Sequence, residues 1–196
     1  MSDQAATLDP VVPLELGPLR ALAGVWEGDE GLDVAYANAR GLIVETPFRE
    51  RAEFKPFGPV DNGQQVLFGL DYRMAAWRPD EETPFHTEVG YWLWDAAEGQ
   101  VMRCFMVPRG STILAGGAAT ADTTTFRLAA DVGSESYGIL SNLYLVKLAR
   151  STSYRATISI DGDVWSYDQE TLIEHARWHE VVCHTDRNRL RRVTPS

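Results

Sequence analysis

Apolar and polar residues alternate along most of the chain with a period of two, which is the pattern of β-strands with one buried face. In FHTEVGYWLWD (residues 85–95), the odd-numbered positions form one face, and the even-numbered positions, which include His86, Glu88 and Trp92, form the other. In RATISIDGDVWSYD (residues 155–168), two alternating runs flank Asp161-Gly162, a dipeptide typical of a tight hairpin turn. Both segments predict antiparallel strands.

Turn-forming residues separate the alternating runs at short intervals, as in DNG at 61–63 and PRG at 108–110. Many short strands predict a sandwich or a barrel, and closing an antiparallel meander into a barrel removes its exposed edges. We therefore expect an all-β fold, an antiparallel up-and-down β-barrel of about ten strands with room inside for a ligand. The expected strands span residues 24–31, 42–55, 65–78, 85–95, 100–107, 111–119, 123–131, 151–161, 163–173 and 179–193.

Two segments interrupt the strand pattern. LGPLRALA (16–23) predicts a short N-terminal helical turn, and YGILSNLYLVKLAR (137–150) is a long connection that can hold another helical turn. Residues 1–15 lack periodicity and are expected to be an N-terminal tail. Because the remainder contains no repeat, low-complexity segment or linker, residues 16–196 are expected to form a single β-barrel domain.

The charge and the hydropathy of the chain limit the classes of partner that we expect for this barrel. The net charge of −10 at pH 7 argues against binding to nucleic acid or to an anionic membrane. The chain has no apolar run of the roughly 20 residues that a spanning helix needs, and residues 1–18 lack the basic and apolar segments of a secretory signal. We therefore expect a cytoplasmic protein with a small-molecule ligand in the barrel cavity, no nucleic acid and no membrane; a homodimer stays open.

The two cysteines, Cys104 and Cys183, are far apart in the sequence, and neither belongs to a CxxC pair. This spacing excludes the usual redox and zinc-knuckle motifs. In a reducing compartment we expect two buried free thiols.

The common catalytic motifs are absent from the sequence, including GxSxG, GxGxxG, the P-loop and HExxH. The candidate chemistry therefore rests on four histidines: His86, His175, His179 and His184. In HARWH, His175 and His179 are four residues apart and could share a zinc ion, but no third ligand occurs at motif spacing. We expect these two to be surface histidines.

Two interpretations are open for each remaining histidine. His86 and Glu88 share a strand face, so they form either a half-buried polar pair beside aromatic packing or part of a pocket. In CHTDRNRL (183–190), His184 shares a strand face with Asp186 and Asn188. Such inward polar residues need hydrogen-bond partners, unless a β-bulge resets the alternation. His184 is either a strand-end histidine or a ligand of something inside the barrel.

Three motifs in this order resemble the nitrobindin family, whose haem-binding β-barrel also occurs as the C-terminal domain of a THAP-type zinc-finger protein. The family begins with GxWxGxG. In LAGVWEG (22–28), three fixed positions match, but Glu30 stands where the last glycine is expected and Gly31 follows. LDVAYANA (32–39) replaces the Tyr-Pro-Thr segment that usually comes next.

The second motif is PFHTEVGYW (84–92), which is similar to the strand of the family that carries a pocket-facing histidine and an acidic residue. The third is SYD (166–168) followed by a final strand, HTDRNRLRRV (184–193), which opens with a histidine. In the family this histidine is the proximal haem ligand. The spacing from His184 to Leu190 is one residue longer than in the usual pattern.

The resemblance implies a lipocalin-like, fatty-acid-binding-protein-like barrel that holds haem b, with His184 as the iron ligand and His86 as a second pocket residue. It also implies nitric oxide binding by ferrous iron and isomerisation of peroxynitrite to nitrate by ferric iron, so an enzymatic role is one expectation. The alternative is a haem-free carrier of a fatty acid or another lipophilic molecule, with Arg103 or Arg155 facing inward to meet a carboxylate. A regulatory domain without a ligand is the third interpretation.

Overall fold

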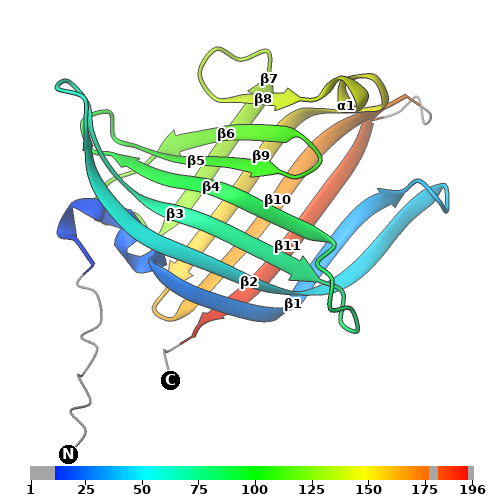
Figure 1. The fold of residues 1–196 in the computed structure, drawn as a ribbon, viewed down its shortest axis with the longest axis horizontal. Helices are drawn as coiled ribbons and strands as arrows, with labels where there is room; N and C mark the ends of the chain where they lie inside the picture. Colours follow the sequence, from blue (N-terminus) through cyan, green and yellow to red (C-terminus); the bar gives the residue numbers. More distant parts are fainter. Residues whose placement is uncertain (1–11, 177–180, 194–196) are drawn as a thin grey trace, which may run out of the picture.

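A computed structural model of the chain describes residues 12–176 and 181–193. Within these residues, eleven strands form one closed barrel (Figure 1). The predicted all-β barrel of about ten strands is confirmed, because all neighbours around the barrel are antiparallel except one short pair, β7 and β8. The order around the barrel is β1, β11, β10, β9, β7, β8, β6, β5, β4, β3, β2.

The elements follow the turn signals of the sequence closely. The helical segments are the 3-10 helix η1 (Leu14–Leu22) and the α-helix α1 (Leu143–Leu148). The strands are β1 (Gly24–Ala37), β2 (Leu42–Asp61), β3 (Val66–Trp77), β4 (His86–Asp95), β5 (Gln100–Val107), β6 (Ser111–Ala118), β7 (Thr125–Val132), β8 (Gly138–Ser141), β9 (Ala149–Asp161), β10 (Val164–His175) and β11 (Val181–Arg192).

The connection predicted at 137–150 contains the expected helical turn, α1, and also one strand that the sequence did not indicate. The side chain of Asn142 accepts a hydrogen bond from the backbone N–H of Leu145 and so caps α1. The additional strand, β8, pairs with β6 and, in parallel, with β7. Its four residues are too short to establish a period of two.

The first strand is longer than predicted and contains a β-bulge. The register between β1 and β2 shifts between Gly28 and Gly31, and the pairing of β1 with β11 shifts at the same place. Trp26 is buried before the bulge, whereas Asp33 and Ala35 line the interior after it. The bulge therefore exchanges the inward and outward positions of β1.

One end of the barrel is closed by the N-terminal helix η1, and α1 lies at the other end (Figure 1). The apolar side of η1 places Leu16, Leu19 and Leu22 at 0% exposure in the core. The indole Nε1–H of Trp26 donates to the carbonyl of Leu22 at 2.8 Å, which joins η1 to β1. This end is filled by side chains, so any ligand space lies toward α1.

Both cysteines are free thiols, as predicted, but the prediction that they are buried is wrong for Cys183, which is exposed. Cys183 precedes His184 on β11, and since successive side chains alternate, an inward His184 places Cys183 on the outer surface. Cys104 on β5 is half-buried. Across residues 12–176 and 181–193, no helix has the length and apolar character needed to cross a bilayer.

Candidate functional site

A cavity of about 330 Å³ lies inside the barrel, which is at the lower end of the size of small-molecule sites. Aromatic and aliphatic side chains form much of its wall: Phe48, Met74, Phe85, Phe105, Ile113 and Leu145. Polar side chains form the rest, mainly Asp33, His86, Glu88, Gln169, His184 and Asp186. Both histidines that the sequence singled out line this cavity.

His184 enters the cavity from β11, beside β1. Its Nε2 lies 2.7 Å from Oδ1 of Asp33 on β1, and the two side chains are 32% and 17% exposed. Burial lowers the pKa of His184. The hydrogen bond to Asp33 and the charges of Asp186 and Asp33 raise it by more, so the pKa lies above the usual value. His184 therefore faces the ligand space, with a carboxylate on its ring nitrogen.

The polar residues that follow His184 also face inward, and each has a partner. The Nε2–H group of Gln169 donates to Asp186, and the Nδ2–H group of Asn188 donates to Glu50 at 2.9 Å. Burial raises the pKa of Asp186 to about 6. The pairing of β10 with β11 is continuous from Val181 to Arg191, so the bulge considered for this strand is absent and lies in β1 instead.

His86 enters the cavity from β4, at the opposite side of a polar network from Asp186. Its Nε2 lies 3.2 Å from Oε1 of Glu88, so the predicted pair on one strand face is present, and it also lines the pocket. Burial lowers the pKa of His86, and the hydrogen bond and charge of Glu88 raise it above its usual value. His86 is therefore both a member of a polar pair with Glu88 and a residue of the pocket wall.

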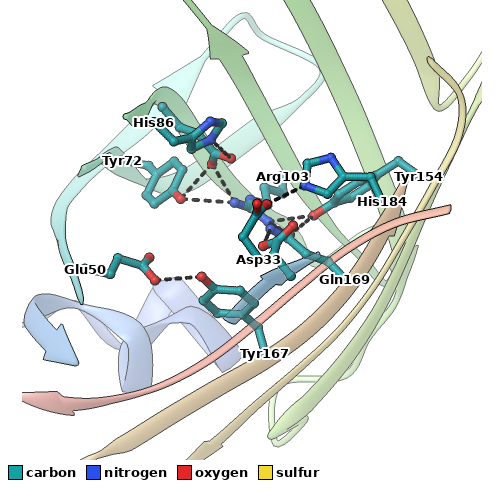
Figure 2. Close-up of polar contacts among 11 residues, drawn as sticks. Asp33, Glu50, Tyr72, His86, Arg103, Tyr154, Tyr167, Gln169 and His184 are labelled. Atoms are coloured by element: carbon teal, nitrogen blue, oxygen red, sulfur yellow. Dashed lines mark hydrogen bonds and ion pairs between the residues drawn. The ribbon is translucent and has the colours of Figure 1, made fainter. Parts of the chain in front are cut away.

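Arg103 on β5 connects the two sides of the site (Figure 2). Its guanidinium donates to Glu88 at 2.6 Å and to Gln169 at 2.9 Å. It also donates to the hydroxyl groups of Tyr72 and Tyr154 at 3.0 and 2.6 Å. The inward Arg103 agrees with the sequence, but Arg155 lies on the outside and pairs with Asp131.

Because Arg103 is already paired with Glu88, its charge is not free to receive a ligand carboxylate. Burial raises the pKa of Glu88, but Arg103, His86 and Tyr72 outweigh this and hold the pKa well below its usual value. Gln169 continues the network to Asp186. The interior thus contains a fixed hydrogen-bonded chain from His86 to Asp186.

A buried carboxyl group that the sequence analysis missed is Glu50 on β2. It accepts a hydrogen bond from the hydroxyl of Tyr167 at 2.6 Å (Figure 2). It also accepts one from Asn188 at 2.9 Å. Its other oxygen, Oε1, has no hydrogen-bond partner among residues 12–176 and 181–193, and burial raises the pKa of Glu50 to about 7. The sequence contained a signal for it, since Glu50 has the same parity on β2 as the inward residues Phe48 and Ala52.

The prediction of surface histidines in HARWH is wrong for His175, and His179 lies outside the described residues. His175 is buried at the end of β10, and its ring packs against Tyr36 at a centroid distance of 5.0 Å. It has the same parity as the inward Gln169. Within the described ranges, no group of three or more His, Cys, Asp or Glu side chains is arranged to hold a metal ion.

Comparisons with known proteins bear on this cavity. The sequence model of the family described as "THAP4-like, heme-binding beta-barrel domain" matches residues 15–192. A peroxynitrite isomerase of Clavibacter michiganensis subsp. michiganensis is 36% identical over 83 residues, which are 41% of this chain and 36% of that protein. The crystal structure of Rv2717c from M. tuberculosis has a TM-score of 0.64 at 19% identity, over 93% of this chain and 99% of that one. The chain thus matches little more than a third of the isomerase, and the structural likeness shows the fold.

Proposed function

Because this chain belongs to the family of THAP4-like haem-binding β-barrel domains, we propose that it binds haem b in the barrel cavity, with Nε2 of His184 as the iron ligand. The family resemblance seen in the three sequence motifs is confirmed by this match. The observation that carries the proposal is the position of His184, whose imidazole lines the barrel cavity. Imidazole is a common haem ligand in proteins.

The residues of the cavity fit a haem with one condition. Phe48, Phe85 and Phe105 provide apolar faces that suit a porphyrin ring and exclude water. The imidazole of His184 lines the same cavity. The condition is that Asp33, which occupies Nε2 of His184 in the present arrangement, moves away from that nitrogen.

When bound, haem iron would supply a site for nitric oxide and for the conversion of peroxynitrite to nitrate, which is the activity named for the Clavibacter relative. The residues of this chain would contribute by holding His86 in a fixed position in the cavity. Glu88 fixes the ring of His86, and Arg103 and Tyr72 in turn fix Glu88. His86 can then donate a ring N–H to a small oxygen-containing ligand inside the cavity.

Titration with haemin tests haem binding directly. Wild type is expected to develop a Soret band, and H184A is expected to lose or shift that band. H86A is the matched control, because it removes a cavity histidine without removing the proposed ligand, and it should keep the band. Failure of wild type to form a band with excess haemin would overturn the proposal.

The isomerase activity needs its own measurement. Stopped-flow decay of peroxynitrite should be faster with haem-loaded protein than with the ligand-free chain, and the ratio of nitrate to nitrite should rise. An unchanged decay rate and product ratio would restrict the function to binding.

A haem-free carrier is the second candidate, and the apolar part of the cavity wall favours it. Its usual anchor, a free inward arginine, is missing among the described residues, because Arg103 is paired with Glu88. Native mass spectrometry of the purified protein separates the two candidates. A co-purified acyl chain would support the carrier, and a mass difference equal to haem b would support the haem protein.

A further inference from the structure

We infer that Asp33 sets the haem affinity of this barrel, because it holds the ring nitrogen of His184 that is the proposed iron ligand. The inference rests on the proposed function and adds to it a residue that sets the affinity for haem. A ring nitrogen has a single position in the plane of the imidazole for a proton or a metal. At 2.7 Å from Oδ1 of Asp33, Nε2 of His184 uses that position for a hydrogen bond.

Asp33 reaches His184 because of the β-bulge in β1. The register shift between Gly28 and Gly31 changes the parity of the strand, so that Asp33 points into the barrel beside β11. On the ladder, Asp33 lies opposite Asp186, two residues from His184. Without the extra residue, the alternation that buries Trp26 would place position 33 on the outer surface.

The two cavity histidines differ in how firmly their carboxylates are held. Glu88, which binds His86, also receives hydrogen bonds from Arg103 at 2.6 Å and Tyr72 at 2.8 Å. Among residues 12–176 and 181–193, Asp33 has no side-chain partner except His184. Asp33 can therefore leave without breaking another interaction, whereas Glu88 cannot. His184 is the histidine that can be released, and Asp33 determines how often it is free.

The apparent affinity of a site falls by the fraction of molecules in which it is competent to bind. A hydrogen bond between charged groups is among the stronger ones in proteins. We therefore expect removal of the Asp33 carboxylate to lower the Kd for haemin by about tenfold or more, which corresponds to about 1.4 kcal/mol.

Haemin titrations of D33A and D33N, followed by the Soret band, test this inference. D33A is expected to bind about tenfold more tightly than wild type, and D33N, which keeps an acceptor but loses the charge, is expected to show a smaller gain. D131A is the matched control, since Asp131 pairs with Arg155 on the outer surface; its Kd should equal that of wild type. Circular dichroism shows whether each variant is folded. If D33A does not fold, the Kd of D33N is the test of the inference.

A double variant shows whether the gain passes through His184. D33A/H184A should lose both the tighter binding and the band of an imidazole-ligated haem. An unchanged Kd in a folded Asp33 variant, or a gain that persists in D33A/H184A, would overturn the inference.

Comparison of wild type with D33A distinguishes failure of this inference from failure of the proposed function. Equal binding by wild type and D33A leaves haem binding intact and removes the role of Asp33. A band in D33A alone supports the role of Asp33 and shows that the native arrangement excludes haem. No band in either protein contradicts both.

Discussion

Arg103 and Glu88 form an ion pair of 2.6 Å inside the barrel, with side chains only 5% and 4% exposed. They lie on the neighbouring strands β5 and β4, and both belong to the network that joins His86 to Asp186. The loss of one partner of such a pair leaves a buried charge without compensation, which is costlier than the loss of both.

Replacement of Arg103 is therefore expected to destabilise the barrel strongly. R103M should lower the free energy of unfolding by about 3–5 kcal/mol, because Glu88 stays buried without its counter-ion. R155M is the control: Arg155 forms an exposed pair with Asp131, and its loss should cost about 1 kcal/mol or less. Urea unfolding followed by tryptophan fluorescence measures both.

The double variant R103M/E88L refines this prediction. Since it removes both charges, it should recover much of the stability that R103M loses. If the double variant were as unstable as R103M, packing of the arginine stem rather than the unpaired charge would be the cause.

Glu50 is expected to make stability depend on pH near neutrality. Its pKa is raised from 4.5 to about 7 in the folded barrel by burial, so the folded state binds a proton that the unfolded state releases. Wild type should therefore lose stability as the pH rises from the unfolded pKa through the folded one, with no further loss above it. The full effect is on the order of 3 kcal/mol.

The isosteric variant E50Q isolates this contribution, because glutamine can still accept from Tyr167 and Asn188 without ionising. Unfolding curves of wild type and E50Q should diverge between about pH 4.5 and pH 7 in favour of E50Q. Parallel curves across that range would show that Glu50 stays charged in the folded state. Asp186, whose pKa is raised to about 6, titrates in both proteins, and its charge is one of the causes that raise the pKa of Glu50.

Because η1 closes one end of the barrel, we expect the loss of stability on truncating its leucines to depend on their position. Leu19 is fully buried, whereas Leu14 on the same helix is 73% exposed. L19A should lower the free energy of unfolding by about 2–5 kcal/mol through lost burial and the cavity it leaves. L14A should change it by less than about 0.5 kcal/mol, and similar losses in both variants would contradict the closure by η1.

The two thiols should react at different rates with a thiol-specific reagent. Cys183 is exposed on the outside of β11 and should react first. Cys104 is half-buried, and burial raises the pKa of its thiol to about 11, so little thiolate forms at neutral pH. C183S should abolish the faster phase and leave the slower one, and both thiols of wild type should react together in denaturant.

The alternation of residues was sufficient to determine which side chains share a strand face. It placed His86 with Glu88 and His184 with Asp186, and it offered Arg103 as an inward arginine; all of these residues lie inside the barrel. The reason is that a strand exposes successive side chains on opposite faces, so one buried aromatic residue assigns its neighbours. The N-terminal helical turn and the turn at α1 were also readable from local sequence.

Only the tertiary structure decided which side chains meet. Asp33 and His184 are 151 positions apart, and their contact depends on barrel closure between β1 and β11 and on the bulge that turns Asp33 inward. The sequence analysis considered a bulge in the last strand, after His184, whereas the bulge lies in β1, next to the displaced Gly31. Strand registers are fixed by long-range pairing, and a shift of one residue reverses every side chain that follows. The sequence by itself therefore determined a β-barrel that resembles a haem-binding family, with two histidines that each share a strand face with a carboxylate residue. The tertiary structure decided that both histidines line the cavity, and closure of the barrel placed a carboxylate on the ring nitrogen of one of them.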